Sequence, residues 1–388
     1  MAADPDRHAR IQSALEKSAL DALVCCGPTE VLLLSGYWPI IGASVAVFTG
    51  SGDVHLIVPQ DEMALAQATS AAKVTPYRPF SLNQLSTPIR ALAGPLASIL
   101  RSMALSGKNL GVEFRQRMQP ATYAASLEYY GALIDLLESL HLSVHFVSCD
   151  PVLEPLKATK TSAELRLMRK AAEIAGSGFA AAPEWIRPGV RESEVSAACL
   201  QAFDTSPQAD DVERSYGFFY CMSGENSAEA SAAYSRTRQR VLREGDLVLI
   251  HANTCADGYW TDITRTYTVG APSERQVAMR RAIDEARAEA LRAAYPGALA
   301  RDVDRAARSV MERHGLGEAF RHSTGHGVGF AAANANGLPR IHPKSPDVIE
   351  EGMTFNIEPA AYFDGYGGMR HCDVVAVTSD GAAVLTEF

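Results

Sequence analysis

The most informative segment of this sequence is His251-Ala-Asn-Thr-Cys-Ala-Asp-Gly-Tyr-Trp-Thr-Asp262-Ile-Thr-Arg-Thr266. Asp257-Gly258 near its centre is typical of the tight turn of a β-hairpin, because both residues tolerate the backbone conformation that such a turn requires. The apolar run 247–251 that leads into it reads as a strand. We therefore predict two antiparallel strands that carry His251 on one arm and Asp262 on the other.

Three more side chains of similar chemistry follow in comparable places. His326 lies in Gly325-His-Gly-Val-Gly329, Glu358 follows a predicted strand at 353–357, and Cys372 begins another that continues through 373–377. A carboxylate or histidine at the end of a strand, taken alone, more often makes an ordinary structural hydrogen bond than binds a metal. Because all five side chains can bind metal, we treat them together as the candidate metal-binding set: His251, Asp262, His326, Glu358 and Cys372.

Helices and strands alternate around these positions. Helical spacing is found at 161–182, 191–203, 274–295 and 300–314, and a further strand is predicted at 217–221. Thr161-Ser-Ala-Glu164 has the pattern of a capped helix start. Helix pairs that alternate with antiparallel strands predict an α+β domain over residues 153–388.

The first part of the chain, residues 1–152, predicts a smaller α/β domain. Short apolar runs at 21–26, 44–48, 54–58, 110–114 and 144–148 read as strands, and 60–72, 88–103 and 119–143 have helical spacing. Such a pattern is typical of a mixed sheet covered by helices. Asp150-Pro-Val-Leu-Glu-Pro155 interrupts it, and we place the domain boundary between residues 152 and 153.

Composition narrows the class of protein. A chain of 388 residues with 47% hydrophobic content has enough apolar residues for the cores of two domains. Its formal charge of -9, without a cluster of Lys or Arg, argues against nucleic acid or a membrane as partner. Seven scattered cysteines without a C-x-x-C pair indicate reduced thiols. Since we find neither a signal peptide nor a spanning apolar run, we expect a cytoplasmic location.

Five motifs in the second half resemble, in order and spacing, those of a known family. They are Gly245-Asp-Leu-Val-Leu-Ile250, Thr261-Asp-Ile-Thr-Arg-Thr266, Thr324-Gly-His-Gly-Val-Gly329, Glu351-Gly-Met-Thr-Phe-Asn-Ile-Glu-Pro359 and Gly368-Met-Arg-x-x-Asp373. The family comprises methionine aminopeptidase, aminopeptidase P, prolidase and creatinase. The resemblance implies an α+β pita-bread catalytic domain preceded by a smaller creatinase-like α/β domain, and it implies a homodimer.

The resemblance also implies a metal site, but with two exchanged ligands. In the peptidase branch, Asp, Asp, His, Glu and Glu hold two divalent metals. The matching positions in this chain are His251, Asp262, His326, Glu358 and Cys372, so the first and last carboxylates are replaced. Imidazole brings no negative charge, and a thiolate rarely bridges two hard cations. We therefore expect one divalent transition metal, Zn, Fe, Co or Mn, with a metal-free site of the creatinase kind as the alternative.

Two histidines of the family's peptidases have no counterpart here. Ser231 or Tyr234 stands at the first place, and Ala333 stands at the second.

Arg370 is suited to bind a carboxylate bidentately, although an internal salt bridge to Glu358 or Asp373 is the alternative. Strand aromatics commonly belong to the core, but some can also wall a pocket. The predicted catalytic residues are Glu358, His326, His251 and His322, and the predicted substrate-binding residues are Arg370, Tyr234, Tyr259 and Trp260.

These observations favour a divergent hydrolase that cleaves a C–N bond, in an amide, peptide or amidine-like group, of a small amino-acid-derived molecule or short peptide. A true Xaa-Pro dipeptidase or aminopeptidase is one alternative. Others are a catalytically inactive binding protein of the same fold, and a lyase or oxidative enzyme with a single metal. The joint retention of Asp262, His326 and Glu358 favours an enzyme over a binding protein.

Overall fold

The chain forms two compact units in the computed structural model, Met1–Lys157 and Ala158–Phe388. The structure describes residues 4–40, 44–69, 72–79, 83, 88–103, 105–114, 129–232, 236–332 and 337–388. The boundary predicted between residues 152 and 153 falls inside helix α7 (Asp150–Ala158). Pro151 lies in the first turn of this helix, where the backbone N–H groups have no partner within the helix, so a proline is compatible with that position. The division of the chain follows Lys157 instead.

The N-terminal unit is built on a six-stranded mixed sheet with the order β4-β3-β2-β1-β5-β6. The β1–β2 and β2–β3 pairs are antiparallel, and the β1–β5, β5–β6 and β3–β4 pairs are parallel. The predicted mixed sheet is confirmed. The strands are β1 (Ala22–Cys25), β2 (Val45–Thr49), β3 (Val54–Pro59), β4 (Lys73–Tyr77), β5 (Asn109–Val112) and β6 (His145–Ser148). Strand β4 was not predicted, because this edge strand is largely solvent-accessible and contains Pro76.

Helices pack on this sheet through apolar side chains such as Leu92, Leu96 and Leu133. The predicted helix at 60–72 is shorter and begins as a 3₁₀ turn, and part of the predicted helix at 119–143 lies outside the described residues. The helical elements before α7 are α1 (Pro5–Lys17), α2 (Pro28–Ser35), η1 (Gln60–Glu62), α3 (Met63–Thr69), α4 (Pro88–Ala91), α5 (Ala93–Ser102) and α6 (Tyr129–Ser139).

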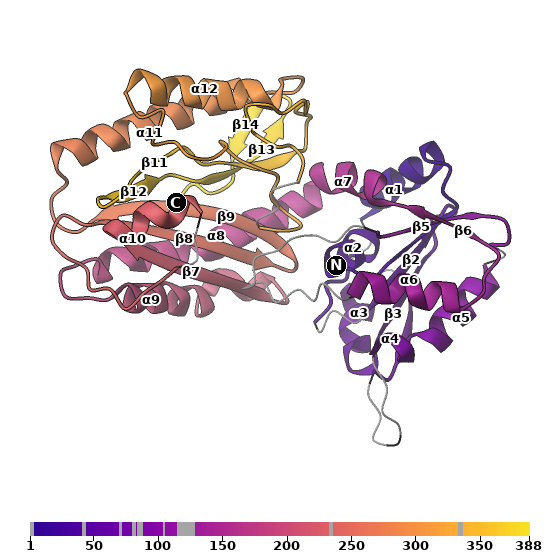
Figure 1. Ribbon diagram of the computed structural model, residues 1–388. Coiled ribbons are helices and arrows are strands. Elements are labelled where there is room, and N and C mark those ends of the chain that lie inside the picture. The colour runs from indigo at the N-terminus through magenta and orange to yellow at the C-terminus, as the bar shows by residue number, and fades with distance from the viewer. Residues whose placement is uncertain are drawn as a thin grey trace. The chain divides into compact units, whose positions relative to one another are not determined.

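One half of the C-terminal unit consists of the antiparallel sheet β7-β8-β9 covered by two helices. The predicted hairpin is confirmed: β8 and β9 pair along their full length, and Asp257 and Gly258 turn the chain with φ of 47° and 93°. Helices α8 and α9 lie against one face of this sheet (Figure 1). The elements are α8 (Ser162–Trp185), α9 (Glu192–Asp204), η3 (Pro207–Asp211), β7 (Ser215–Ser223), α10 (Glu225–Ala228), η4 (Glu229–Ser231), β8 (Leu247–Ala256) and β9 (Tyr259–Thr268).

The other half of the C-terminal unit places two small sheets under another helix pair. The sheet β10-β13-β14 and the hairpin β11-β12 lie between α11 and α12 on one side and the β7-β8-β9 sheet on the other (Figure 1). The predicted α+β organisation is confirmed. The elements are α11 (Glu274–Ala293), α12 (Ala300–Arg313), β10 (Thr354–Ile357), β11 (Ala360–Phe363), β12 (Gly367–Arg370), β13 (Asp373–Thr378) and β14 (Gly381–Val384).

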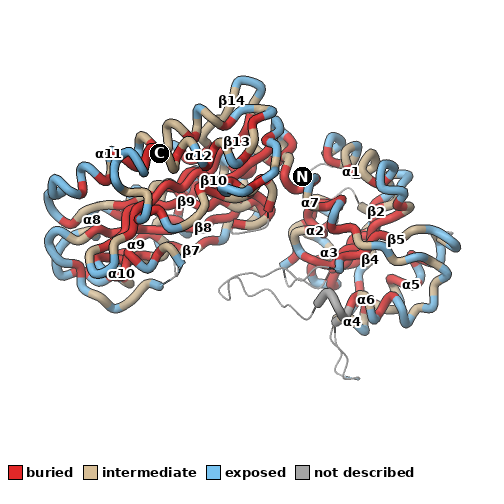
Figure 2. Tube along the Cα trace, turned by 45° about the horizontal axis from the view of Figure 1, so that its top comes forward, coloured by how far each residue is buried: buried red, intermediate tan, exposed pale blue. Residues whose placement is uncertain are grey.

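A backbone bridge joins strand β9 to the start of strand β13 at the centre of this unit. Thr264 of β9 and Cys372, just before β13, exchange both of their backbone hydrogen bonds, with N···O distances of 3.2 and 3.0 Å. The strands around this bridge are buried, whereas the outer faces of the helices are exposed (Figure 2). Polar side chains on these strands are thereby held in the interior.

All seven cysteines are free and buried. Among the described residues, no helix combines the length and the apolar character needed to cross a lipid bilayer.

Candidate functional site

The β8–β9 hairpin places four polar side chains on one face of the sheet. His251 pairs with Thr264, and Asn253 pairs with Asp262. Because side chains alternate between the two faces of a strand, residues two apart share a face, and directly paired residues do as well. All four side chains are buried. The predicted positions of His251 and Asp262 on the two arms thus bring them to one place.

His326 reaches the same place on an irregular segment that precedes strand β10 in the sequence and runs alongside it in space. The backbone of Asn356 donates to the His326 carbonyl at 3.0 Å, and that of Glu358 donates to the Thr324 carbonyl at 2.8 Å. A Cβ atom at Gly325 would overlap the Asn356 carbonyl oxygen, so only glycine permits this close approach. The segment therefore carries His326 alongside the strand that ends at Glu358.

Asp304 of helix α12 anchors the start of this segment. Its buried carboxylate accepts hydrogen bonds from the Thr324 backbone at 3.0 Å and from the Thr324 hydroxyl at 2.8 Å. Arg308 donates to both oxygens of the same carboxylate at 3.0 Å. A buried carboxylate with this many donors is well satisfied, and it fixes the loop two residues before His326.

Asp262 is the centre of the cluster. Its carboxylate oxygens lie 3.5 Å from Nε2 of His326 and 3.6 Å from Nδ1 of His251. The Cys372 thiol donates to the Asp262 carbonyl at 3.2 Å and lies 3.8 Å from its carboxylate. Three members of the predicted set therefore surround the fourth, Asp262.

Arg370 connects this centre to Glu358. Its Nη2 donates to Nδ1 of His251 at 2.9 Å, its Nε donates to Oγ1 of Thr264 at 3.0 Å, and its Nη1 lies 3.7 Å from Oε2 of Glu358. The side chain is only 5% exposed. Of the two predicted alternatives for Arg370, the internal salt bridge to Glu358 is thus present, and the guanidinium still faces the cluster.

His322 joins the cluster indirectly. Its Nε2 lies 2.9 Å from the hydroxyl of Tyr362, which also accepts a hydrogen bond of 3.4 Å from Nη1 of Arg370. Sequence reasoning missed Tyr362. Tyr362 lies on the same face as Arg370, because it is two residues from Ala360, which pairs with Arg370 across the β11–β12 hairpin. Neither of these two strands was predicted, so no pattern in the sequence pointed to Tyr362.

Burial and charge shift the proton affinities of the two histidines in opposite directions. Burial, together with the charge of Arg370 and against that of Asp262, lowers the pKa of His251 to about 4, so its ring is neutral near neutral pH. Burial also acts to lower the pKa of His326, but the hydrogen bond and charge of Asp262 outweigh it and raise the pKa to about 9. Burial, followed by the charges of Asp262 and Glu358, raises the pKa of the Cys372 thiol.

The predicted substrate-binding aromatics separate onto two faces of strand β9. Trp260 is two residues from Asp262 and shares its face, where its ring stacks on Phe218 at 6.2 Å. Tyr220, which sequence reasoning did not select, stacks on His251 at 6.4 Å. Tyr259 points to the opposite face and its hydroxyl donates to Glu164 at 3.4 Å, so it is not part of the site. Tyr234 and Ala333 lie outside the described residues.

The side chains as placed do not fit a bound metal ion. Among the residues that the structure describes, no group of three or more His, Cys, Asp or Glu side chains is arranged to hold one. The reason lies in two donors. Arg370 donates to Nδ1 of His251, the ring nitrogen that lies 3.6 Å from the Asp262 carboxylate. The Asn356 amide nitrogen lies 3.3 Å from Asp262 Oδ2, 3.3 Å from His326 Nε2 and 3.6 Å from Cys372 Sγ. The predicted five-ligand metal set is therefore brought together but not assembled as a coordination sphere.

Comparison with known proteins gives matches over both units. Residues 166–379 match Metallopeptidase family M24, and residues 7–156 match the Creatinase/Prolidase N-terminal domain. The Xaa-Pro dipeptidase of Pyrococcus furiosus is 29% identical over 382 residues, which is 98% of each chain. The prolidase structure from Pyrococcus horikoshii OT3 covers 98% of each chain with 28% identity and a TM-score of 0.78. Dipeptidase PepE from Mycobacterium ulcerans is 27% identical, with a TM-score of 0.74 over 99% of this chain and 95% of that one.

Proposed function

The chain belongs to metallopeptidase family M24 and has the pita-bread fold that its motifs predicted, and from this we propose that it hydrolyses the C–N bond of a short peptide or other small amino-acid-derived substrate. The family is one of hydrolases, and the proposal covers the C–N bond of a peptide, an amide or an amidine-like group. The single observation that carries the proposal is the convergence of Asp262, His326, Glu358 and Arg370 on one buried point of the β-sheet core.

Arg370 supplies the electrostatic part of the proposed reaction. A guanidinium is permanently charged, and in a buried site its interaction with an oxyanion is much stronger than in water. We assign it to hold the oxygen of the scissile group, or a substrate carboxylate, next to Glu358. Thr264 and the Thr266 hydroxyl, which accepts from the Arg370 backbone at 3.1 Å, keep it in place.

Glu358 and His326 supply the proton transfers in the same proposal. Glu358 acts as the general base that takes a proton from the attacking water, since a carboxylate beside a bound carbonyl is suited to that task. His326, held against Asp262, gives a proton to the departing nitrogen. His251 accepts the Arg370 hydrogen bond and so orients the guanidinium, while His322 orients Tyr362.

Xaa-Pro dipeptides are the first substrate class to test, and they form the second candidate function. The observation that favours them is the printed name of the Pyrococcus furiosus relative, Xaa-Pro dipeptidase, which is matched over 98% of this chain. Against it stands the loss of both family histidines, at Ser231 or Tyr234 and at Ala333.

Hydrolysis of a substrate panel tests both candidates. The purified chain is assayed with Xaa-Pro dipeptides, with other dipeptides, and with N-acyl and amidine derivatives of amino acids. We expect turnover of at least one class, and a loss of about 10²-fold or more in Glu358→Gln, which is the usual contribution of a general base. Full activity in Glu358→Gln would remove Glu358 from the mechanism. No turnover of any class would favour the inactive binding protein, and turnover only with oxygen would favour the oxidative alternative.

Metal content is a separate part of the proposal. The arrangement of Arg370 and Asn356 supports metal-free function, whereas family membership supports a divalent ion. One Zn, Fe, Co or Mn ion is the alternative, held by Asp262, His326, Glu358 and Cys372. Elemental analysis of the wild type and of Cys372→Ala decides between them. We expect well under one ion per chain in both, and one ion that Cys372→Ala loses would establish the single-metal site.

We further infer a homodimer in the cytoplasm. Dimerisation follows from the family resemblance, and size-exclusion chromatography with light scattering tests it. The seven free and buried cysteines support a reducing compartment.

A further inference from the structure

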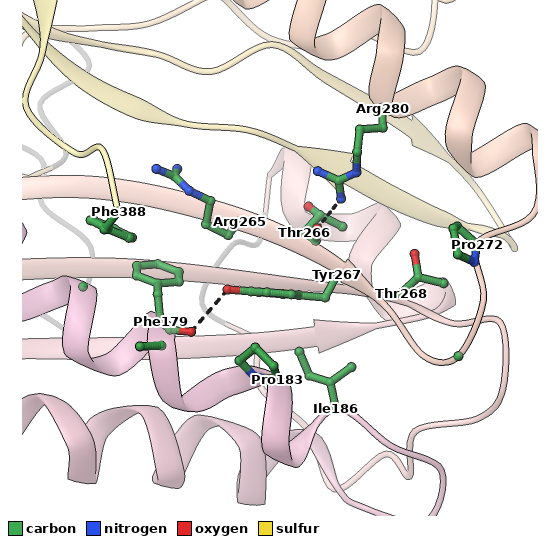
Figure 3. Close-up of a pocket in the computed structure, with 13 residues that line it drawn as sticks. Phe179, Pro183, Ile186, Arg265, Thr266, Tyr267, Thr268, Pro272, Arg280 and Phe388 are labelled. Atoms are coloured by element: carbon green, nitrogen blue, oxygen red, sulfur yellow. Dashed lines mark hydrogen bonds between the residues drawn. The ribbon is translucent and has the colours of Figure 1, made fainter.

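A pocket lies on the C-terminal unit, on the side of strand β9 that faces helix α8. Its volume is about 640 Å³, and it lies between the last turns of α8, strand β9, the start of α11 and Phe388 (Figure 3). The predicted catalytic residues do not line it. A volume of this size is in the range of pockets that bind small organic molecules.

Apolar side chains form one wall of this pocket. The rings of Phe179 and Phe388 stack at 5.4 Å with an interplanar angle of 24°. The hydroxyl of Tyr267 donates to the Phe179 carbonyl at 3.4 Å, which leaves the tyrosine ring along the wall, and Ile186 completes it (Figure 3). Such a surface favours a ligand that buries an aromatic or aliphatic group.

Two arginines line the pocket, and they differ in how their charge is balanced. Arg265 is paired with Asp373 at 2.7 Å. Arg280 extends from α11 and donates to the carbonyl oxygen of Thr266, and among the described residues no carboxylate forms an ion pair with it (Figure 3). Glu244, which packs against Gly270 at the rim, is not among the lining residues. Arg280 therefore lines the pocket without a carboxylate ion-pair partner among the described residues, and Asp284, one turn further along α11, lies 3.6 Å from His371.

We propose that this pocket binds a small amphipathic monocarboxylate. Its carboxylate pairs with the guanidinium of Arg280, because a charge-assisted hydrogen bond satisfies donors that the Thr266 carbonyl leaves unused. Its aromatic or aliphatic group lies against Phe179, Tyr267 and Phe388. A neutral ligand of the same shape loses the charged contact, and a carboxylate without the apolar group loses the buried area.

The pocket is linked to the candidate active site through one strand. The Thr266 carbonyl binds Arg280 in the pocket, and the Thr266 hydroxyl donates to the Arg370 carbonyl at 2.9 Å and accepts from the Arg370 backbone at 3.1 Å. Arg265 likewise donates to the carbonyls of Thr264 and Cys372, at 3.0 and 2.7 Å. A ligand on Arg280 thus contacts the strand that positions Arg370.

Calorimetric titration of the full chain with 4-phenylbutyrate tests the proposal, with 4-phenylbutanol and butyrate as matched ligands. We expect the acid to bind and each of the other two to bind at least about tenfold more weakly. Arg280→Gln is expected to weaken the acid by about tenfold or more. Arg292→Gln, an exposed arginine on the same helix that pairs with Glu289, is the control and is expected to change the affinity less than about twofold.

Further measurements distinguish binding of the acid in this pocket from binding of the acid at Arg370 in the candidate active site. Phe388→Ala removes one ring from the wall at an exposed position and is expected to weaken the acid, while Arg370→Lys, which keeps a buried positive charge beside Glu358, is expected to change its affinity much less than Arg280→Gln does. Hydrogen exchange at the amides of β9 is expected to slow when the acid is bound. The proposal is overturned if the acid and the alcohol bind equally, if Arg280→Gln binds like the wild type, if a folded Arg370→Lys variant loses binding, or if no binding is measurable at millimolar concentration.

Discussion

Replacing Glu113 by glutamine should make the chain more stable at alkaline pH, because this carboxyl is buried beside a second one. Glu113 follows strand β5 and is 2% exposed, and Glu30 of helix α2 is 1% exposed. One oxygen of Glu113 accepts hydrogen bonds from the backbone of Cys26 at 2.7 Å and of Gly27 at 3.2 Å. Lys157 pairs with Glu30 at 2.9 Å. Lys157 also pairs with Glu154 at 3.0 Å, so its charge is shared between Glu30 and Glu154.

The sign of the effect follows from the proton that Glu113 retains. Burial, and then the charge of Glu30, raises the pKa of Glu113 from its ordinary value of 4.5 to about 8. Between these pH values the folded chain holds a proton that the unfolded chain has released. The stability associated with this carboxyl is thus fully present below pH 4.5 and is lost as pH rises towards 8. The shift from 4.5 to about 8 corresponds to a free energy on the order of 5 kcal/mol.

Glutamine reproduces the protonated carboxyl, since its oxygen can accept from the two backbone amides while its NH₂ group can donate to Glu30. We expect Glu113→Gln to match the wild type near pH 5 and to exceed it near pH 9 by roughly 2 to 4 kcal/mol. Urea unfolding followed by the fluorescence of Trp38, in a Trp185→Phe/Trp260→Phe background, reports on the N-terminal unit, which has no other tryptophan.

The exposed Glu138 of helix α6 provides the control. Glu138→Gln should follow the wild type at every pH, because an exposed carboxyl is solvated in both the folded and the unfolded state. The reasoning about Glu113 would be refuted by a Glu113→Gln variant that has the same pH profile as the wild type, or that is less stable than the wild type at pH 9.

Three further predictions concern the C-terminal unit. Gly325→Ala should cost about 3 kcal/mol in the free energy of unfolding, because the new Cβ overlaps the carbonyl of Asn356; an unchanged denaturation midpoint would contradict this. Gly258→Ala should cost about 1 to 2 kcal/mol, since φ is 93° there, and equal stability of the two proteins would show that the turn relaxes. The buried Cys372 should resist iodoacetamide at pH 8 in the native chain and react after unfolding; rapid native labelling in peptide mapping would show an accessible thiol.

Much of the fold was predictable because local signals and burial agree. Asp257-Gly258 specifies a hairpin, and the apolar run before it specifies a fully buried strand, so the chain adopts both. The helix start at Thr161-Ser-Ala-Glu164 is confirmed by the reciprocal hydrogen bonds of its capping box. The helix over Asp150–Ala158 was not predicted, because its prolines were interpreted as breaks. A proline in the first turn of a helix is in fact compatible with that position.

Only part of the candidate site could be predicted from the spacing of residues along the chain. His251 and Asp262 were placed together correctly, because strand pairing in a tight hairpin follows from the turn. Tyr259 and Trp260 were both predicted to bind substrate, yet neighbours on a strand face opposite sides and only one of them can. For Arg370, the salt bridge to Glu358 was one of the two predicted alternatives. The role of Asn356 as a donor inside the cluster depends on contacts between segments far apart in the chain, and no sequence pattern indicated it.

The backbone bridge between Thr264 and Cys372 has an evolutionary consequence. Both of its hydrogen bonds are made by main-chain atoms, so the junction of the two half-domains does not depend on which side chain residue 372 carries. The side chain at this position can therefore change while the main-chain junction stays in place. By the same logic, the double substitution His251→Asp and Cys372→Glu would add two acidic side chains to the cluster without removing either hydrogen bond of the bridge.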